Sequence, residues 1–315
     1  MYKILSIDGG GIKGIAPASL LANIEERTNK KIIDYFDLIV GTSTGGIIAL
    51  GLGLGFTARE ILSLYLDNGD KIFKKQFFLK SLCGIRAPVY DSTALRTLLT
   101  EKFKGKLLGQ SKIRLVIPSF DIVNNTVCMF KTSHHPRLQM DYTMKAEDVA
   151  LSTAAAPYFF SPHKTVEDRF LVDGGMFANN PTLVGVVEGL SLLEWPKEDI
   201  RVLSLGCSEE TPEYSKLAGK KSGIFHWGLG LIDLAFNSQS SCSLGMAKLL
   251  LDDRSNDKIL RISSVLSKGD VALDDIRQSK KLAGIGQENA RQYIEKIQNI
   301  FLDEKATPFT PCHAL

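Results

Sequence analysis

Residues 36–46 read FDLIVGTSTGG, an apolar run followed by a glycine-rich turn. The run over residues 36–40 predicts a buried β-strand, and the apolar residues after the turn predict a buried helix. Inside the turn, Gly41 and Gly45 enclose Ser43 in a G-x-S-x-G pattern. This pattern between a strand and a helix is typical of a nucleophile elbow, in which a strained turn exposes the serine hydroxyl. We therefore predict that Ser43 is a nucleophile and that both glycines are needed for close packing of the elbow.

The same region raises the question of a membrane span. Residues 38–58 carry no charged side chain and are numerous enough to cross a bilayer as a helix. Six of these residues are glycines, however, and Thr42, Ser43 and Thr44 interrupt the apolar sequence. This composition favours a buried strand, a tight turn and a buried helix over a membrane-spanning helix.

Outward from this turn, apolar runs and helical patterns alternate along the chain. The runs predict strands at residues 3–7, 36–40, 113–118, 127–130, 169–172, 201–205 and 258–262. Helical periodicity and capping patterns predict helices from residue 15 to about residue 29, after Thr57, over residues 146–156, after Asn180 and over residues 285–302. Alternating strands and helices predict an α/β fold with a mainly parallel central sheet flanked by helices on both faces. We expect a single domain over residues 1–315, in which residues 206–315 complete the sheet and its helical cover.

Composition limits the partners and the compartment. Lys and Arg number 38 and Asp and Glu 35, and the formal net charge of +3 is too small to favour a nucleic acid polymer as a partner. The five cysteines form no C-x-x-C pair, which predicts reduced thiols and no zinc site. The sequence starts with an apolar strand pattern and lacks the regions of a signal peptide, so we expect a cytoplasmic protein.

A second glycine-rich turn, residues 8–14 (DGGGIKG), follows the first predicted strand. It could bind a dinucleotide, with Asp34 as the acid that binds the ribose, or its backbone amides could form an oxyanion hole. The elbow favours the oxyanion hole, because the carboxyl ends of the first two parallel strands lie side by side. The predicted oxyanion and substrate-binding residues are Gly9, Gly10, Gly11 and Gly14.

Asp173-Gly174-Gly175 follows the apolar run at residues 170–172. If this run is a strand, its end places the Asp173 carboxylate at the same edge of the sheet as Ser43. Such an aspartate can accept the hydroxyl proton of a serine and act as a general base, and the alternative is a solvated turn residue.

The three motifs, in this order, resemble the signatures of the patatin-like phospholipase family. These are a glycine-rich oxyanion motif near the N-terminus, a G-x-S-x-G elbow and a later Asp-Gly-Gly or Asp-Gly-Ala motif. The resemblance continues through residues 152–157 (STAAAP) and 179–181 (NNP), and it covers about residues 1–205. It implies a three-layer sandwich related to the α/β-hydrolase fold. Lys13 departs from the pattern, because the family often has arginine there, and lysine lacks the bidentate fork.

The resemblance implies a lipid acyl hydrolase of the phospholipase A or lysophospholipase type. Ser43 is then the nucleophile and Asp173 the base of a dyad that needs no histidine, and amides around Gly10 and Gly11 bind the oxyanion. The reaction proceeds through an acyl-enzyme and requires no metal or other cofactor. The implied partners are membrane phospholipids at the bilayer surface, with peripheral membrane association during catalysis. Some bacterial members are antiviral effectors switched on by cyclic nucleotides, so the resemblance also makes a nucleotide a candidate activator of this protein.

Two other functions remain open from the sequence. Ser43, Asp173 and His226 occur in the chain order of an α/β-hydrolase triad, and a nucleotide-binding module could use the glycine-rich turn. A further hypothesis concerns Lys71–Leu82, where phenylalanines and lysines alternate irregularly. We expect this segment to dock on the membrane, and the alternative is a partly buried helix with a solvated lysine edge.

Overall fold

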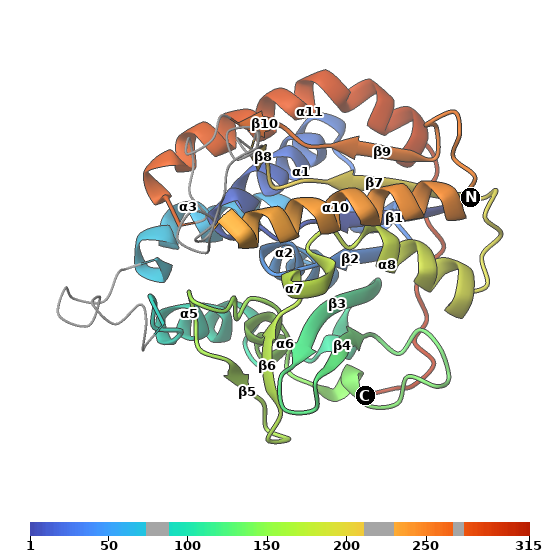
Figure 1. Ribbon diagram of the computed structural model, residues 1–315. Coiled ribbons are helices and arrows are strands. Elements are labelled where there is room, and N and C mark those ends of the chain that lie inside the picture. Colours follow the sequence, from blue (N-terminus) through green and yellow to red (C-terminus); the bar gives the residue numbers. More distant parts are fainter. Residues whose placement is uncertain (74–87, 211–229, 267–273) are drawn as a thin grey trace, which may run out of the picture.

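The computed structural model describes residues 1–73, 88–210, 230–266 and 274–315 (Figure 1). Its central sheet has the strand order β5-β6-β3-β2-β1-β7-β9, and β4 pairs with β3. The strands are β1 (Tyr2–Ile7), β2 (Leu38–Gly41), β3 (Arg114–Asp121), β4 (Thr126–Lys131), β5 (His163–Lys164), β6 (Phe170–Asp173), β7 (Ile200–Leu205) and β9 (Ile259–Ile262). Each predicted strand is present, with bounds that differ by no more than three residues. A separate small sheet pairs β8 (Glu209–Glu210) with β10 (Val265–Leu266).

The sheet has two parts that differ in strand direction. Strands β2, β1, β7 and β9 are parallel to one another, and β2 is also parallel to the first residues of β3. We call these four strands the parallel half. The strands β4, β5 and β6, together with residues 117–121 of β3, pair in antiparallel fashion and are called the antiparallel half. The prediction of a mainly parallel sheet is confirmed.

Helices flank the sheet on both faces. They are α1 (Ile15–Thr28), α2 (Thr44–Gly53), α3 (Ala58–Ile72), α5 (Thr93–Phe103), α6 (Ala146–Thr153), α7 (Gly175–Ala178), α8 (Thr182–Val187), α10 (Gly230–Leu250) and α11 (Ser279–Phe301). Leu5 and Ile39 belong to an apolar core shared with α1, α3 and α11, whereas Ile4 and Val40 face a second core shared with α8 and α10. Because side chains alternate along a strand, each parallel strand contributes to both cores. Figure 1 shows α11 on one side of the sheet and α8 and α10 on the other.

Local capping explains where two of the predicted helices begin. The Thr57 amide donates to Glu60 Oε2 at 2.8 Å, and the Glu60 amide donates to Thr57 Oγ1 at 3.2 Å, which confirms the predicted capping box of α3. Asn180 Oδ1 accepts from the amide of Thr182, the first residue of α8, at 3.0 Å, whereas Pro181 occupies the N-cap position. Helix α10 was not predicted, since its middle is rich in serine and glycine. The Ser243 hydroxyl donates to the Asn180 carbonyl at 2.8 Å, one of the contacts that hold α10 against α8.

One edge of β3 carries two strands in succession. Its first residues pair with β2, where Val40 lies opposite Val116, and its last residues pair with β6, where Asp173 lies opposite Ser119. Strand β4 occupies the other edge of β3 from Val116 onward. Strands β2 and β6 therefore approach each other head-on along the same edge. Asp173 reaches the end of β2 from the opposite direction, because β6 is antiparallel to β3.

Two membrane-related hypotheses can be compared with the fold. No helix within the described residues is both long and apolar enough to cross a membrane. The uncharged residues 38–58 form β2, the elbow, the buried helix α2 and the start of α3. Of the hypothesised docking segment, Phe73 packs edge-on against the Tyr90 ring, and residues 74–82 lie outside the described residues.

Candidate active site

Ser43 occupies a strained turn between β2 and α2. Its backbone has φ 55° and ψ −122°, a conformation that side chains rarely adopt, and its side chain is largely buried. A Cβ atom at Gly41 would lie 2.2 Å from the Gly45 carbonyl oxygen, and one at Gly45 would lie 2.3 Å from the Ile7 carbonyl oxygen. Both glycines are thus required by close backbone contacts, and the local geometry is that of a nucleophile elbow.

Asp173, at the end of β6, lies against the elbow. The Ser43 side chain lies close enough to its carboxylate to lower the pKa of Asp173, and Asp173 Oδ1 accepts from the Gly175 amide at 2.7 Å. Burial is the larger effect and raises the pKa of Asp173 to about 6, although the Ser43 side chain and the Gly175 amide oppose this shift. A carboxylate with this pKa is ionised near neutral pH and can still accept and return a proton.

Thr153 holds the elbow in position, a role that the sequence analysis missed. Its Oγ1 accepts from the Ser43 amide at 2.9 Å and donates to the Pro118 carbonyl at 2.6 Å. Helix α6 therefore links the turn after β2 to the middle of β3. The short motif around Thr153 was noticed only as part of a resemblance, because nothing local in the sequence connects it to Ser43.

The glycine-rich turn after β1 lies beside Ser43. The Gly9 amide donates to the Asn179 carbonyl at 2.9 Å, and a Cβ atom at Gly9 would lie 3.2 Å from Ser43 Cβ. Among the described residues, none accepts a hydrogen bond from the Gly10 or Gly11 amide. Gly11 has φ 57°, which favours glycine. Of the four predicted glycines, Gly10 and Gly11 therefore retain amides that can meet an anion, whereas the Gly9 amide is already bonded.

Gly14 has a packing role in this arrangement. A Cβ atom there would lie 2.2 Å from Thr44 Oγ1, so its absence allows the first turn of α2 to approach the glycine-rich turn. The nucleophile elbow, the Asp173 carboxylate and the glycine-rich turn therefore lie together at one site.

Comparison with known proteins identifies this arrangement. The family described as Patatin-like phospholipase matches residues 5–186. The chain belongs to this family. It is accordingly a phospholipase, and the predicted family, fold and lipid ester hydrolase activity are confirmed.

Relatives of this patatin-like phospholipase come from bacteria and plants. A "cGAMP-activated phospholipase" of Pseudomonas aeruginosa is 37% identical over 76% of this chain and 72% of its own length. A protein of the same name from Escherichia coli is 33% identical over 98% of this chain and 94% of its own length. "Patatin-like protein 4" of Arabidopsis thaliana is 30% identical over 87% of this chain and 79% of its own length. The similarity therefore extends well beyond the three motifs.

The described histidines of this patatin-like phospholipase bond to groups other than Ser43 and Asp173. His134 Nε2 lies 2.8 Å from Glu188 Oε1, and His163 Nε2 lies 3.1 Å from Asp148 Oδ1. His226, the residue of the hypothetical triad, lies outside the described residues. In the part of the chain that the structure describes, no histidine is bonded to the pair.

A cavity of about 220 Å³ lies close to Asp173. The Asp173 amide donates to the Ala155 carbonyl at 3.0 Å, and Ala155 also lines this cavity. Its other walls include Ala154, Phe160 and His163, with Arg96 at the side. Small and aromatic residues therefore line the cavity together with two cations, Arg96 and Lys164.

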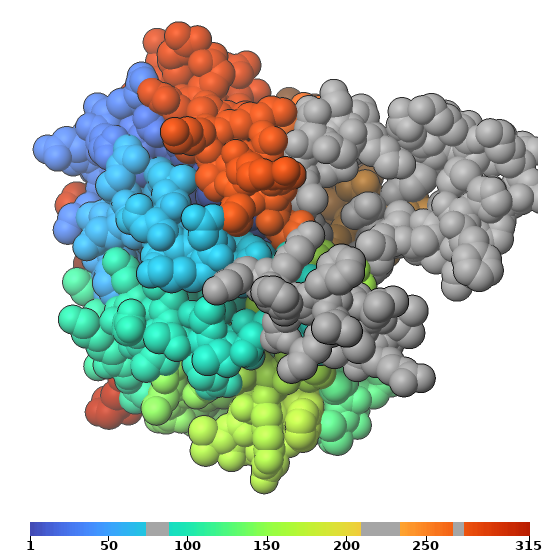
Figure 2. All heavy atoms as spheres, turned by 90° about the vertical axis from the view of Figure 1, so that its left-hand side faces the viewer, coloured from blue at the N-terminus to red at the C-terminus, as the bar shows by residue number. Residues whose placement is uncertain are grey.

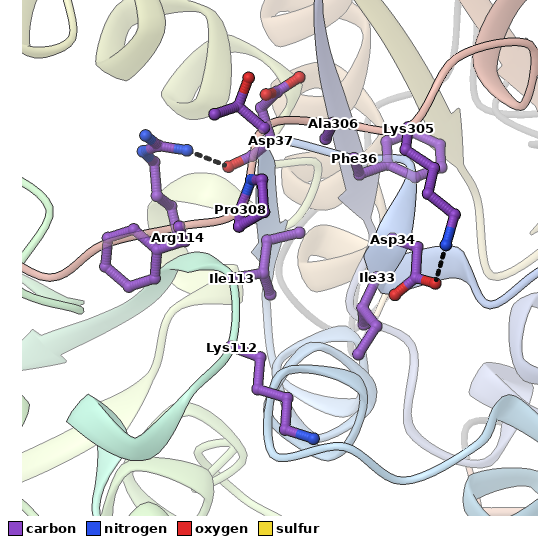
Figure 3. A pocket seen from close by; sticks show the side chains of 12 residues that line it. Ile33, Asp34, Phe36, Asp37, Lys112, Ile113, Arg114, Lys305, Ala306 and Pro308 are labelled. Carbon is purple, nitrogen blue, oxygen red and sulfur yellow. Dashed lines mark hydrogen bonds and ion pairs between the residues drawn. The ribbon is translucent and has the colours of Figure 1, made fainter.

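A second cavity of about 220 Å³ lies at the opposite end of the sheet, where β2 and β3 begin (Figure 3). Asp34 lines it and forms an ion pair with Lys305 at 3.1 Å. Asp34 thus precedes β2 and lies far from the glycine-rich turn, which argues against its proposed part in binding a dinucleotide. Within the described residues, no cluster of three or more His, Cys, Asp or Glu side chains could hold a metal ion.

Proposed function

We propose that Ser43 and Asp173 form the catalytic dyad of this phospholipase. The observation that carries the proposal is the proximity of the Ser43 side chain to the Asp173 carboxylate, at the point where β2 and β6 meet. The strained backbone of Ser43 and the raised pKa of Asp173 support it, because both are typical of groups set up for chemistry.

In the proposed reaction, Ser43 Oγ attacks the carbonyl carbon of a phospholipid ester while Asp173 accepts the hydroxyl proton. The amides of Gly10 and Gly11 stabilise the negative oxygen of the tetrahedral intermediate. When the carbon–oxygen bond of the leaving group breaks, Asp173 returns the proton to the departing alcohol and the acyl group stays on Ser43. Water then attacks the acyl carbon while Asp173 accepts a proton from it. When the bond between the acyl carbon and Ser43 Oγ breaks, Asp173 returns this proton to Ser43 Oγ and the fatty acid leaves.

The substrate proposed is a glycerophospholipid at the surface of a bilayer, so the protein would associate peripherally with membranes during catalysis. The cavity beside Asp173 supports this substrate class, because it offers apolar walls from Ala154 and Phe160 next to the Arg96 guanidinium. A cavity of this kind suits an ester that joins an apolar chain to an anionic headgroup.

We extend the proposal to activation by a cyclic nucleotide. The support is the similarity to proteins named cGAMP-activated phospholipase, one of which matches over 98% of this chain. Such activation would suit a defence effector that remains inactive until a nucleotide signal is made.

The dyad is tested with a fluorophosphonate probe and a soluble short-chain ester. With a panel of cyclic nucleotides present, wild type should be labelled and active, Ser43→Ala should be neither, and the control Ser238→Ala, at an exposed serine of α10, should match wild type. Labelling that persists in Ser43→Ala would contradict the proposal.

Activation is tested separately on phosphatidylcholine vesicles with a panel of cyclic nucleotides that includes cGAMP. Release of fatty acid should rise with one member of the panel in wild type and not in Ser43→Ala. If the vesicles are hydrolysed at the same rate without nucleotide and with each nucleotide of the panel, the proposed activation is refuted and the proposed dyad is not affected.

A further inference from the structure

Exposed apolar side chains gather at two hairpin tips of the antiparallel half. The turn between β3 and β4 carries Ile122 and Val123, which are 46% and 66% exposed. The turn between β5 and β6 carries Val166, which is 90% exposed, and Phe170 follows it at 38%. Contiguous exposed apolar residues at a projecting edge are unusual on a surface that faces only water.

The two tips are neighbours in space. The Ile122 amide donates to the Phe170 carbonyl at 3.0 Å, which joins one turn to the other. Figure 1 shows both turns at the lower edge of the molecule, and Figure 2 shows the β5–β6 hairpin, in yellow-green, at the lower end of a second view. We call Ile122, Val123, Val166 and Phe170 the tip cluster.

A buried carboxylate fixes the tip cluster in shape. Asp121 Oδ1 accepts from the Val123 and Asn124 amides at 3.0 and 3.1 Å, so it shapes the first turn. Asp121 Oδ2 accepts from Arg169 Nε at 3.1 Å, so it also holds the second turn. The apolar side chains are thus presented by a preorganised scaffold, which lowers the entropy lost when they are buried.

The tip cluster lies near the dyad. Phe170 precedes Asp173 by three residues of β6, which corresponds to roughly 10 Å at the usual rise of a strand. On β3, Ile122 follows Ser119, the residue opposite Asp173, by the same number of positions. Any surface that binds the tip cluster would therefore lie within about the length of strand β6 from Asp173 and Ser43.

The charges around the tip cluster indicate what kind of surface it binds. The two turns and their flanks carry two cations, Lys164 and Arg169, against three anions, Asp121, Glu167 and Asp168. Lys164 pairs with Asp168 at 2.7 Å, and Arg169 pairs with Asp121. With no excess of positive charge, attraction to anionic lipids is not favoured, and apolar insertion remains as the source of binding.

We propose that the tip cluster inserts into the headgroup and acyl boundary of a zwitterionic bilayer and brings the dyad to its substrate. The inference rests on the phospholipase function proposed above, because that function requires a bilayer close to Ser43. Binding of this kind depends on apolar area and not on counter-charge, so added salt does not weaken it.

The first experiment measures co-sedimentation with phosphatidylcholine vesicles in a Ser43→Ala background, which prevents hydrolysis. Replacing Val123 and Val166 together by serine should lower vesicle binding by at least roughly tenfold, since each valine buries its side chain on insertion. The matched control is Leu249→Ser, an 81% exposed leucine at the end of α10, which should bind like the parent protein. Equal binding by the double variant and the parent would overturn the proposal.

The second experiment separates this inference from the dyad. In the active background, the double variant should keep the hydrolysis rate on a soluble short-chain ester and lose about tenfold on phosphatidylcholine vesicles. Equal loss on both substrates would show that the tips support the fold and would overturn the insertion. Inactivity of the parent on the soluble ester, both without nucleotide and with each nucleotide of the panel, would instead contradict the proposed dyad.

A third measurement locates the tips directly. Val166→Trp should shift its fluorescence emission to shorter wavelength when phosphatidylcholine vesicles are added, and Leu249→Trp should not. The shift should persist at high salt. A shift that appears only with anionic vesicles and disappears with salt would overturn insertion by apolar contact.

Discussion

The parallel and antiparallel halves of the sheet differ in how they are covered and in what they supply. The parallel half is enclosed by helices on both faces and supplies Ser43 together with the glycine-rich turn. The antiparallel half ends in exposed hairpin tips and supplies Asp173. The proposed dyad therefore joins a turn enclosed by helices to the buried end of a strand whose other end, at Phe170, reaches the surface.

The largest expected effect tests whether the two halves act as one catalytic unit. Ser43→Ala should lower kcat on a soluble ester by more than about 10³-fold, and Asp173→Ala by about 10² to 10⁴-fold. The double variant should be no less active than the worse single variant, because each change removes the same proton transfer. If the fold-losses in kcat of the two single variants multiply in the double variant, the two residues act independently. Circular dichroism of all three variants controls for the fold.

The next effect concerns the stability of the antiparallel half. Since burial raises the pKa of Asp173 to about 6, ionising this group disfavours the folded state. The stability that its proton contributes is fully present below about pH 3.8, the ordinary pKa, and is lost as pH rises through about 6. Asp173→Asn stays neutral, so its free energy of unfolding should exceed that of wild type by up to about 3 kcal/mol at pH 8 and match it near pH 3.5.

Urea denaturation at the two pH values measures this difference. An asparagine variant that is less stable than wild type at pH 8 would mean that the carboxylate is favoured in place, contrary to the raised pKa.

A third prediction addresses the parallel half alone. A Cβ atom at Gly10 would lie 2.4 Å from Cys207 Cβ, so Gly10→Val must displace the glycine-rich turn. Loss of one oxyanion donor should lower kcat by about 10²-fold, with a smaller change in KM. In the control Gly245→Ala, the added atom meets nothing within 4 Å among the described neighbours, and kcat should be unchanged. Equal kcat for Gly10→Val and wild type would remove this turn from the oxyanion hole.

The smallest effect compares two ion pairs of the hairpin tips. The side chain of Asp121 is 1% exposed and that of Arg169 27%, whereas Lys164 and Asp168 are 58% and 79% exposed. Arg169→Gln should lower the free energy of unfolding by about 2 kcal/mol, since it leaves a buried carboxylate with one charged partner fewer. Lys164→Gln should have no measurable effect, because exposed pairs are screened by water. Similar midpoints for both variants would show that the tips are not held through Asp121.

The elbow could be predicted from the sequence because its requirements are local. Gly41 is needed by a contact within the turn itself, and the apolar runs of β1 and β2 are buried on both faces. The requirement for glycine at position 45 is less local, since it comes from the Ile7 carbonyl at the end of β1. The direction of β6 could not be predicted, since residues 122–169 decide whether the chain enters the sheet parallel or antiparallel. The contact between Thr153 and Ser43 was missed for the same reason, because it links residues 110 positions apart.

The Gly9 amide illustrates a finer limit. A glycine-rich turn offers several backbone donors, and sequence alone does not distinguish those that are free from those that bond elsewhere in the fold. The Asn179 carbonyl, which accepts from Gly9, belongs to a segment far away in the chain. Helix α10 was missed because tertiary contacts with α8 outweigh its weak helix propensity.

The head-on meeting of β2 and β6 has a consequence for the order in which the molecule loses its parts. Strand β6 is registered with β3 through three residue pairs, whereas β1 is registered with β7 through six. Opening of the β5–β6 hairpin would separate Asp173 from Ser43 while the parallel half stayed folded, as expected for a cooperative unit of low local stability. Backbone amides of β6 would then exchange with deuterium before those of β1, and enzymatic activity would disappear at a lower denaturant concentration than the helical signal.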